Sequence, residues 1–213
     1  NVSVVGCHFV NLGETDADNV IRQPDASRTT LNSLRNANVF AHGEIMMRRS
    51  TYEKVGGYRP IFKYSADYDL WLRMIAISKF GTVPDILYKR YMLSDGVSYN
   101  PEKAIQMVKY HALGWTLSFR PDEYEKIIVK HGDSAPIDEI LPDRNSKVQR
   151  KMLRLCMRFA YFSQFNEAAR IADRILPRFF GKSISLALKL PLIQKAIRLV
   201  GRFGIRQIKA PIT

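Results

Sequence analysis

The hydrophobic periodicity of the chain changes near residue 101, and this change limits the folds that it can adopt. Before residue 101, β-branched runs alternate with helix-like segments, whereas beyond it apolar residues recur at helical spacing. Residues 2–10 are predicted to form a buried strand, and residues 82–91 a second strand that Pro84 interrupts. We therefore predict an α/β region followed by helices.

Several shorter elements are predicted between these two strands. Residues 27–38 are compatible with a helix, and residues 39–48 are predicted to form a short buried strand. Ser50 is a suitable N-cap for a helix over residues 51–55, which ends at Gly56-Gly57. A phosphate loop is disfavoured there, since no GxGxxG or GK[ST] pattern surrounds the two glycines. We interpret them as a turn that requires positive φ angles.

The most regular helix of the first hundred residues is predicted to begin after Ser65 and to end near Gly81. Its core face consists of Leu70, Met74 and Ile77, and its first turn holds Asp67 and Asp69. Because each residue advances about 100° around a helix, the two carboxylates point in different directions. Asp67 shares a face with Trp71 and can project into a cleft, whereas Asp69 turns toward the preceding loop or the backbone. An aspartate in a first turn is either a general base or an ordinary cap.

Composition places the charge of the protein in its helical part. The chain has 213 residues, 46% of them hydrophobic, and a formal net charge of +13, which favours an anionic partner. Residues 147–209 hold many lysines and arginines, against two acidic residues. Cys7 and Cys156 lie far apart, which disfavours a disulfide framework and a metal knuckle and fits a reducing, cytosolic setting. No apolar run is long enough to span a bilayer.

The helical part is predicted to contain a connector, a hairpin and a basic tail. Residues 133–145 have the composition of a connector, and helices over 147–165 and 167–176 resemble a single tetratricopeptide unit. Residues 183–208 combine an apolar stripe with basic residues at helical spacing: Lys195, Arg198, Arg202, Arg206 and Lys209. This tail is either an amphipathic surface for an anionic membrane or a helix packed on its own domain.

The order of several motifs resembles the second half of bacterial family-2 glycosyltransferases of the GT-A type. The motifs are His42, the run Met46-Met47-Arg48-Arg49, Val55-Gly56-Gly57-Tyr58-Arg59, Asp67-Tyr68-Asp69-Leu70-Trp71-Leu72-Arg73, and a strand with Leu87-Tyr88. The resemblance covers about residues 1–100. It implies a partial GT-A, Rossmann-like domain, the acceptor-side half, followed by a helical hairpin and amphipathic basic helices.

The resemblance also implies roles for individual residues. In that family the first aspartate of the acidic motif is the base that deprotonates the acceptor hydroxyl, which here is Asp67. Tyr68 and Trp71 are expected to contact the acceptor and His42 the donor side. Gly57, Asp69 and Arg90 complete the expected substrate-binding set.

The sequence departs from the family pattern at two places. Ala66 stands where many relatives have Glu or Gln, and Lys89-Arg90-Tyr91-Met92-Leu93-Ser94 replaces a pattern with Arg and His before Ser. At the second place, Arg90 or Lys89 can supply the charge that the imidazole does not.

The nucleotide-binding half of the family is expected to precede this chain. A divalent metal, Mg²⁺ or Mn²⁺, is therefore expected to have its ligands upstream, and no metal ligand is assigned within residues 1–213. Asp16-Ala17-Asp18 matches the Asp-X-Asp pattern of the family's metal motif, but it follows the first strand instead of preceding it. We interpret residues 1–100 as half of a catalytic domain that is inactive alone, 101–145 as a connector and 146–213 as a basic tail.

The expected partners are a nucleotide-sugar donor, a glycan or lipid-linked acceptor of cell-surface polysaccharide synthesis, and an anionic membrane surface. This predicts a cytoplasmic protein, peripheral at the inner face of the cell membrane. Two alternatives stay open: a nucleic-acid-binding module that uses the basic tail, and a helical adaptor built on the hairpin. The first lacks a recognisable nucleic-acid motif, and no nucleic acid is expected as a partner.

Overall fold

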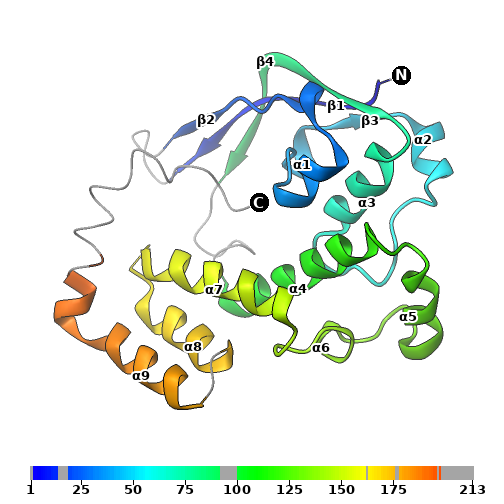
Figure 1. Ribbon diagram of the computed structural model, residues 1–213. Helices are drawn as coiled ribbons and strands as arrows, with labels where there is room; N and C mark the ends of the chain where they lie inside the picture. Colours follow the sequence, from blue (N-terminus) through cyan, green and yellow to red (C-terminus); the bar gives the residue numbers. More distant parts are fainter. Residues whose placement is uncertain are drawn as a thin grey trace. The chain divides into compact units, whose positions relative to one another are not determined.

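A computed structural model of the chain describes residues 2–13, 19–91, 100–161, 163–175, 178–195 and 197, and shows a mixed α/β protein whose helices lie mostly in the C-terminal part (Figure 1). The chain forms two compact units. Unit 1 contains the described residues of 1–100 and 113–134. Unit 2 contains those of 101–112 and 135–212. The expected connector, residues 101–145, is thus divided between the two units.

A four-stranded mixed sheet organises unit 1. Its central strand is β1 (Val2–Leu12), which pairs in parallel with β4 (Lys79–Tyr91). On the other edge, β1 pairs antiparallel with β3 (Met46–Met47) near its start and with β2 (Val20–Arg22) near its end (Figure 1). The register shifts between Cys7 and His8, opposite Pro84, which confirms the predicted interruption of the second strand.

The helix α3 (Ala66–Ile75) buries its apolar face against this sheet. Its residues Leu70, Trp71 and Met74 are fully buried in a core with Val4, Phe40 and Phe80. Ile77, predicted on the same face, is exposed because the helix ends at Ile75 and β4 begins at Lys79.

The segments between β2 and α3 are shorter and less regular than predicted. They are η2 (Ala26–Arg28), α1 (Leu31–Asn36), η3 (His42–Glu44) and α2 (Arg49–Lys54). The strand predicted over residues 39–48 was wrong apart from β3, since the turn η3 interrupts it. Arg48, not Ser50, occupies the N-cap position of α2. Gly56 and Gly57 have φ angles of 79° and 64°, which confirms the predicted turn.

The end of α4 (Pro101–Leu117) and the helix α5 (Glu123–His131) belong to unit 1. Arg35 of α1 donates through Nε to the hydroxyl of Ser118 at 2.9 Å, and its guanidinium lies 3.5 Å from the ring centroid of Phe119. Arg59 similarly lies 4.1 Å from the ring centroid of Tyr124. Two stacked arginines therefore hold this segment to the rest of the unit.

Unit 2 is helical. It contains the first part of α4, then α6 (Ile137–Ile140), α7 (Ser146–Tyr161), α8 (Phe165–Ile175) and α9 (Arg178–Lys189). The helix α8 packs against α7 on one side and α9 on the other, and this confirms the predicted hairpin. Cys156 is buried in α7 and donates to the carbonyl of Ala168, while Cys7 is buried in β1; both are free thiols. None of the helices in the described part of the chain is long and apolar enough to cross a membrane.

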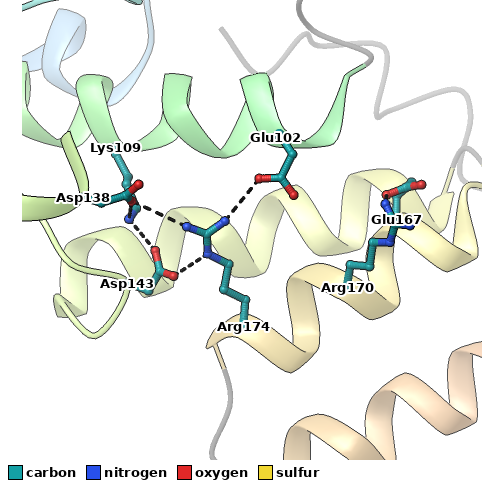
Figure 2. Close-up of polar contacts among 7 residues, drawn as sticks. All are labelled: Glu102, Lys109, Asp138, Asp143, Glu167, Arg170 and Arg174. Carbon is teal, nitrogen blue, oxygen red and sulfur yellow. Dashed lines mark hydrogen bonds and ion pairs between the residues drawn. The ribbon is translucent and has the colours of Figure 1, made fainter. Parts of the chain in front are cut away.

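An ionic network fastens the helices of unit 2 (Figure 2). Lys109 of α4, 1% exposed, pairs with Asp138 and Asp143. Arg174 of α8 also pairs with both aspartates and reaches Glu102 at 3.3 Å. Burial alone would raise the pKa of Asp143, but hydrogen bonds from Lys109 and Arg174 lower it below the ordinary value. Two aspartates thus compensate the charge of the buried ammonium group, and we interpret this network as a structural one.

Candidate functional site

The carboxylate of Asp67 lies in the first turn of α3 and is partly exposed, as the sequence predicted. Ser65, the residue before the helix, occupies the N-cap position but makes no side-chain capping hydrogen bond. Its backbone has a φ angle of 55°, in the left-handed region that residues other than glycine seldom adopt. Such strained backbone is often found beside functional groups, and here it sets the direction from which the chain enters the helix.

The carboxylate of Asp69, two residues further on, is buried in ion pairs within the protein. Its side chain is 2% exposed and pairs with Arg59 at 3.1 Å and with Arg73 at 2.8 Å. Arg73 also donates to the carbonyl of Val55 at 2.6 Å. Asp69 therefore ties the loop before α3 to the helix, and its expected place in the substrate-binding set stays a prediction. The prediction that the two carboxylates point apart is confirmed.

His42 and Tyr58 form a polar pair near Asp67. His42 Nε2 and the hydroxyl of Tyr58 are 2.8 Å apart, and both residues are exposed. Burial of part of its ring raises the pKa of Tyr58, and the negative charge of Asp67 adds to this effect. His42 and Asp67, which the sequence assigned to one site, thus both interact with the same tyrosine. Tyr58 was not among the predicted site residues, although it belongs to the motif after Gly57.

Tyr68 and Trp71, expected to contact the acceptor, are core residues in this structure. Their exposed fractions are 1% and 0%, and the hydroxyl of Tyr68 donates to the carbonyl of Arg35 at 3.2 Å. The ring of Trp71 lies between those of Phe40 and His42, with centroid distances of 5.8 Å and 6.4 Å. Trp71 therefore packs beside His42, and neither aromatic side chain presents a surface to a ligand.

Gly57 and Arg90 also have identifiable neighbours. A Cβ atom on Gly57 would lie 2.9 Å from the ring of Tyr52, so this position excludes side chains and shapes the turn that carries Tyr58. Arg90, near the end of β4, donates through Nε to the side-chain oxygen of Asn11 at 2.8 Å. Burial raises the pKa of the nearby Glu44 carboxyl, and the charge of Arg90 partly opposes this rise.

Glu44 is, with Tyr58, a residue of this region that sequence reasoning missed. It ends the turn η3, is 8% exposed, and interacts electrostatically with Asp67 and Arg90. Burial raises its pKa to about 7. Backbone hydrogen bonds and the charge of Arg90 oppose this rise, whereas the charge of Asp67 adds to it. The only sequence signal was an acidic residue within a run predicted to be a buried strand.

These residues give unit 1 a partly exposed carboxylate, an imidazole paired with a phenol, and the cation Arg90 on β4. In the described part of the chain, no group of three or more His, Cys, Asp or Glu side chains could hold a metal ion. Asp16, Asp18 and the basic positions from Arg198 to Lys209 lie outside the described residues. A surface depression of about 290 Å³ lies beside η2 and α1, and Asp67 does not line it.

Comparison with known proteins returns no match: no family model, no curated protein and no solved structure is significantly similar to this chain.

Proposed function

We propose that unit 1 is the acceptor-side half of an inverting family-2 glycosyltransferase of the GT-A type, with Asp67 as its general base. The observation that carries the proposal is the contrast between two carboxylates in one helical turn. Asp69 is buried in two ion pairs, whereas Asp67 is partly exposed beside the His42–Tyr58 pair. A base must be reachable by the proton that it removes, and Asp67 meets this requirement.

The proposed reaction transfers a sugar from a nucleotide-sugar to a hydroxyl of a glycan or lipid-linked acceptor. Asp67 takes the hydroxyl proton while the acceptor oxygen bonds to the anomeric carbon. The bond from that carbon to the phosphate oxygen of the donor breaks, and the nucleotide leaves with the bonding electrons. A single displacement of this kind inverts the configuration of the anomeric carbon.

The other residues have supporting roles in this proposal. His42, paired with Tyr58, faces the donor side, and Arg90 supplies positive charge near the carboxylates. The nucleotide and the divalent metal, Mg²⁺ or Mn²⁺, are assigned to a segment outside residues 1–213. The proposal requires that segment for activity, so residues 1–213 alone are expected not to transfer sugar.

The test uses the full-length protein that contains this chain. It is incubated with a panel of UDP-, GDP- and dTDP-sugars and a lipid extract of the producing cells, and release of nucleotide is measured. Asp67→Asn is expected to lower the rate by about 10²–10⁴-fold, the usual contribution of a general base. Unchanged turnover in this variant would remove Asp67 from the role, and absence of transfer from every donor would refute the transferase assignment.

A matched control separates lost chemistry from lost folding. Asp122 precedes α5 in the same unit and pairs with Lys126 at the surface. Asp122→Asn makes the same chemical change away from the site and is expected to leave the rate within about twofold, because surface ion pairs contribute little. Circular dichroism of both variants should match that of the unmodified protein.

We also propose that unit 2 holds the protein against an anionic membrane at the cytoplasmic side, where lipid-linked acceptors reside. Large apolar side chains are exposed around the end of α9: Leu186, Leu190 and Leu192, the last of which is 82% exposed. Lys189 and Lys195 are exposed in the same segment. Apolar side chains with flanking cations suit a bilayer interface that carries negative charge.

Co-sedimentation with vesicles tests this second part. The protein is expected to pellet with vesicles that contain anionic lipid and to stay in solution with neutral ones. Leu190→Ser with Leu192→Ser should weaken the pelleting, whereas Leu153→Ser, at an exposed leucine of α7, should not. Equal pelleting with both kinds of vesicle would refute the preference for anionic lipid, and no pelleting with either would refute the membrane role.

A further inference from the structure

The carboxyl group of Glu44 has an incomplete set of hydrogen-bond partners. Oε1 accepts a hydrogen bond from the backbone N–H of Ala41 at 2.6 Å, which closes the turn η3 on itself. Oε2 is buried and has no hydrogen-bond partner among the described residues. An ionised carboxylate in this environment lacks the solvation that it has in water, so burial favours the protonated form.

The groups that face Glu44 come from several elements. Arg90 of β4 and Asp67 of α3 act on it electrostatically, in opposite directions. Gly6 of β1 is a neighbour of Glu44, since a Cβ atom there would be in ordinary van der Waals contact with Glu44 Cγ, at 3.8 Å. Because burial raises the pKa of Glu44 to about 7, both its charged and its neutral form are populated near neutral pH.

The turn that Glu44 closes also carries His42. The imidazole is fixed on one side by the hydroxyl of Tyr58, at 2.8 Å, and packs beside the ring of Trp71. The middle residue, Gly43, lies against the hydroxyl of Tyr88, which would be 2.2 Å from an added Cβ atom. Glu44 closes the same three-residue turn that carries His42, so a movement of the ionised carboxyl group toward water displaces His42 as well.

We propose that Glu44 is a positioning residue of the site, which holds the turn η3 closed and His42 on Tyr58 while it carries its proton, and loosens the turn when it ionises. Its consequence for sugar transfer rests on the proposed function. The response of the turn to pH does not, because it depends only on contacts within unit 1.

The decisive measurement is a ¹³C NMR titration of the 213-residue chain, labelled in the glutamate carboxyl groups and the tyrosine rings. The Glu44 signal is assigned by its absence from Glu44→Gln, and the Tyr58 signal by its absence from Tyr58→Phe. The Glu44 carboxyl is expected to titrate near pH 7, and the Tyr58 ring to shift with the same midpoint. In Asp67→Asn both midpoints should move to lower pH, since Asp67 favours the protonated form.

Variants separate this response from other pH-dependent changes in the protein. In Glu44→Gln the part of the Tyr58 shift that follows Glu44 should disappear. Glu53→Gln, at an exposed glutamate of α2 paired with Arg49, should leave the Tyr58 titration unchanged.

A Glu44 midpoint at its ordinary value, or a Tyr58 ring that does not respond to Glu44, would overturn the proposal. These outcomes do not depend on enzymatic activity, so they are distinct from failure of the transferase assignment. If sugar transfer is observed, the rate of Glu44→Gln should lose the pH dependence centred near 7 that the unmodified protein shows.

Discussion

The two units of the protein differ in how completely their charged side chains are paired. In unit 2, Lys109 is buried between Asp138 and Asp143, and Arg174 meets the same two aspartates. In unit 1, Asp69 is compensated in the same way, but Glu44 keeps one oxygen without a partner and Asp67 stays partly exposed. Charges that are paired with opposite charges help to hold a fold together, whereas charged groups without such partners are available for chemistry. The comparison therefore distinguishes carboxylates that are paired with cations from Glu44 and Asp67, which we propose to be functional.

The largest effect on stability is expected from the network of unit 2. Lys109→Ala leaves Asp138 and Asp143 without the ammonium between them and should lower the free energy of unfolding by about 3 kcal/mol. Lys126→Ala, which removes an exposed lysine paired with Asp122 and Glu123, should change it by less than about 0.5 kcal/mol. Chemical denaturation measures both, and similar losses would contradict the distinction between buried and exposed pairs.

A somewhat smaller loss is expected from Asp69→Asn. The amide cannot compensate both Arg59 and Arg73, so the free energy of unfolding should fall by about 2 kcal/mol. Asp67→Asn, two residues away, should leave stability nearly unchanged. If Asp67→Asn destabilised the protein as much as Asp69→Asn does, the assignment of Asp67 to chemistry instead of structure would be wrong.

Glu44→Gln is expected to stabilise the protein in a pH-dependent way. The folded-state pKa of Glu44 is raised from 4.5 to about 7, so the folded protein binds the proton more tightly than the unfolded chain does. The stability contributed by the protonated form is complete below pH 4.5 and is lost as pH rises toward 7. Glutamine avoids this loss, so its advantage should be absent at pH 4 and on the order of 2 kcal/mol at pH 8. Thermal unfolding at both pH values measures it, and an advantage independent of pH would point to packing alone.

The smallest effect concerns two serines with left-handed backbone, one in each unit. Ser65 and Ser163 have φ angles of 55° and 62°. Glycine adopts these angles without strain, so Ser65→Gly and Ser163→Gly should each raise the free energy of unfolding by about 0.5 kcal/mol. Only Ser65→Gly should alter sugar transfer, because it changes the entry into α3 just before Asp67. Equal effects of both variants on the transfer rate would remove Ser65 from the site.

Local patterns in the sequence predicted the regular elements well. The strand β1, the interruption at Pro84, the turn at Gly56-Gly57 and the hairpin of α7 and α8 were all predicted from periodicity and turn chemistry. These features depend on neighbours within a few residues, which a single sequence contains. The turn η3 was missed because its hydrogen bond from Ala41 to Glu44 competes with strand formation in a run whose residues otherwise favour a strand.

What the sequence by itself determined is the placement of Asp67 and Asp69 in the first turn of a helix and their divergence around its axis. Only the tertiary structure decided which of the two is buried in ion pairs and which is partly exposed. Arg59 lies ten residues before Asp69 in the sequence. Glu44 interacts electrostatically with Arg90, which belongs to the strand β4 much further along the chain. The burial of Tyr68 and Trp71 likewise depends on how α3 packs on the sheet. Exposure and compensation of charge are properties of packing between distant segments, and local periodicity does not encode them.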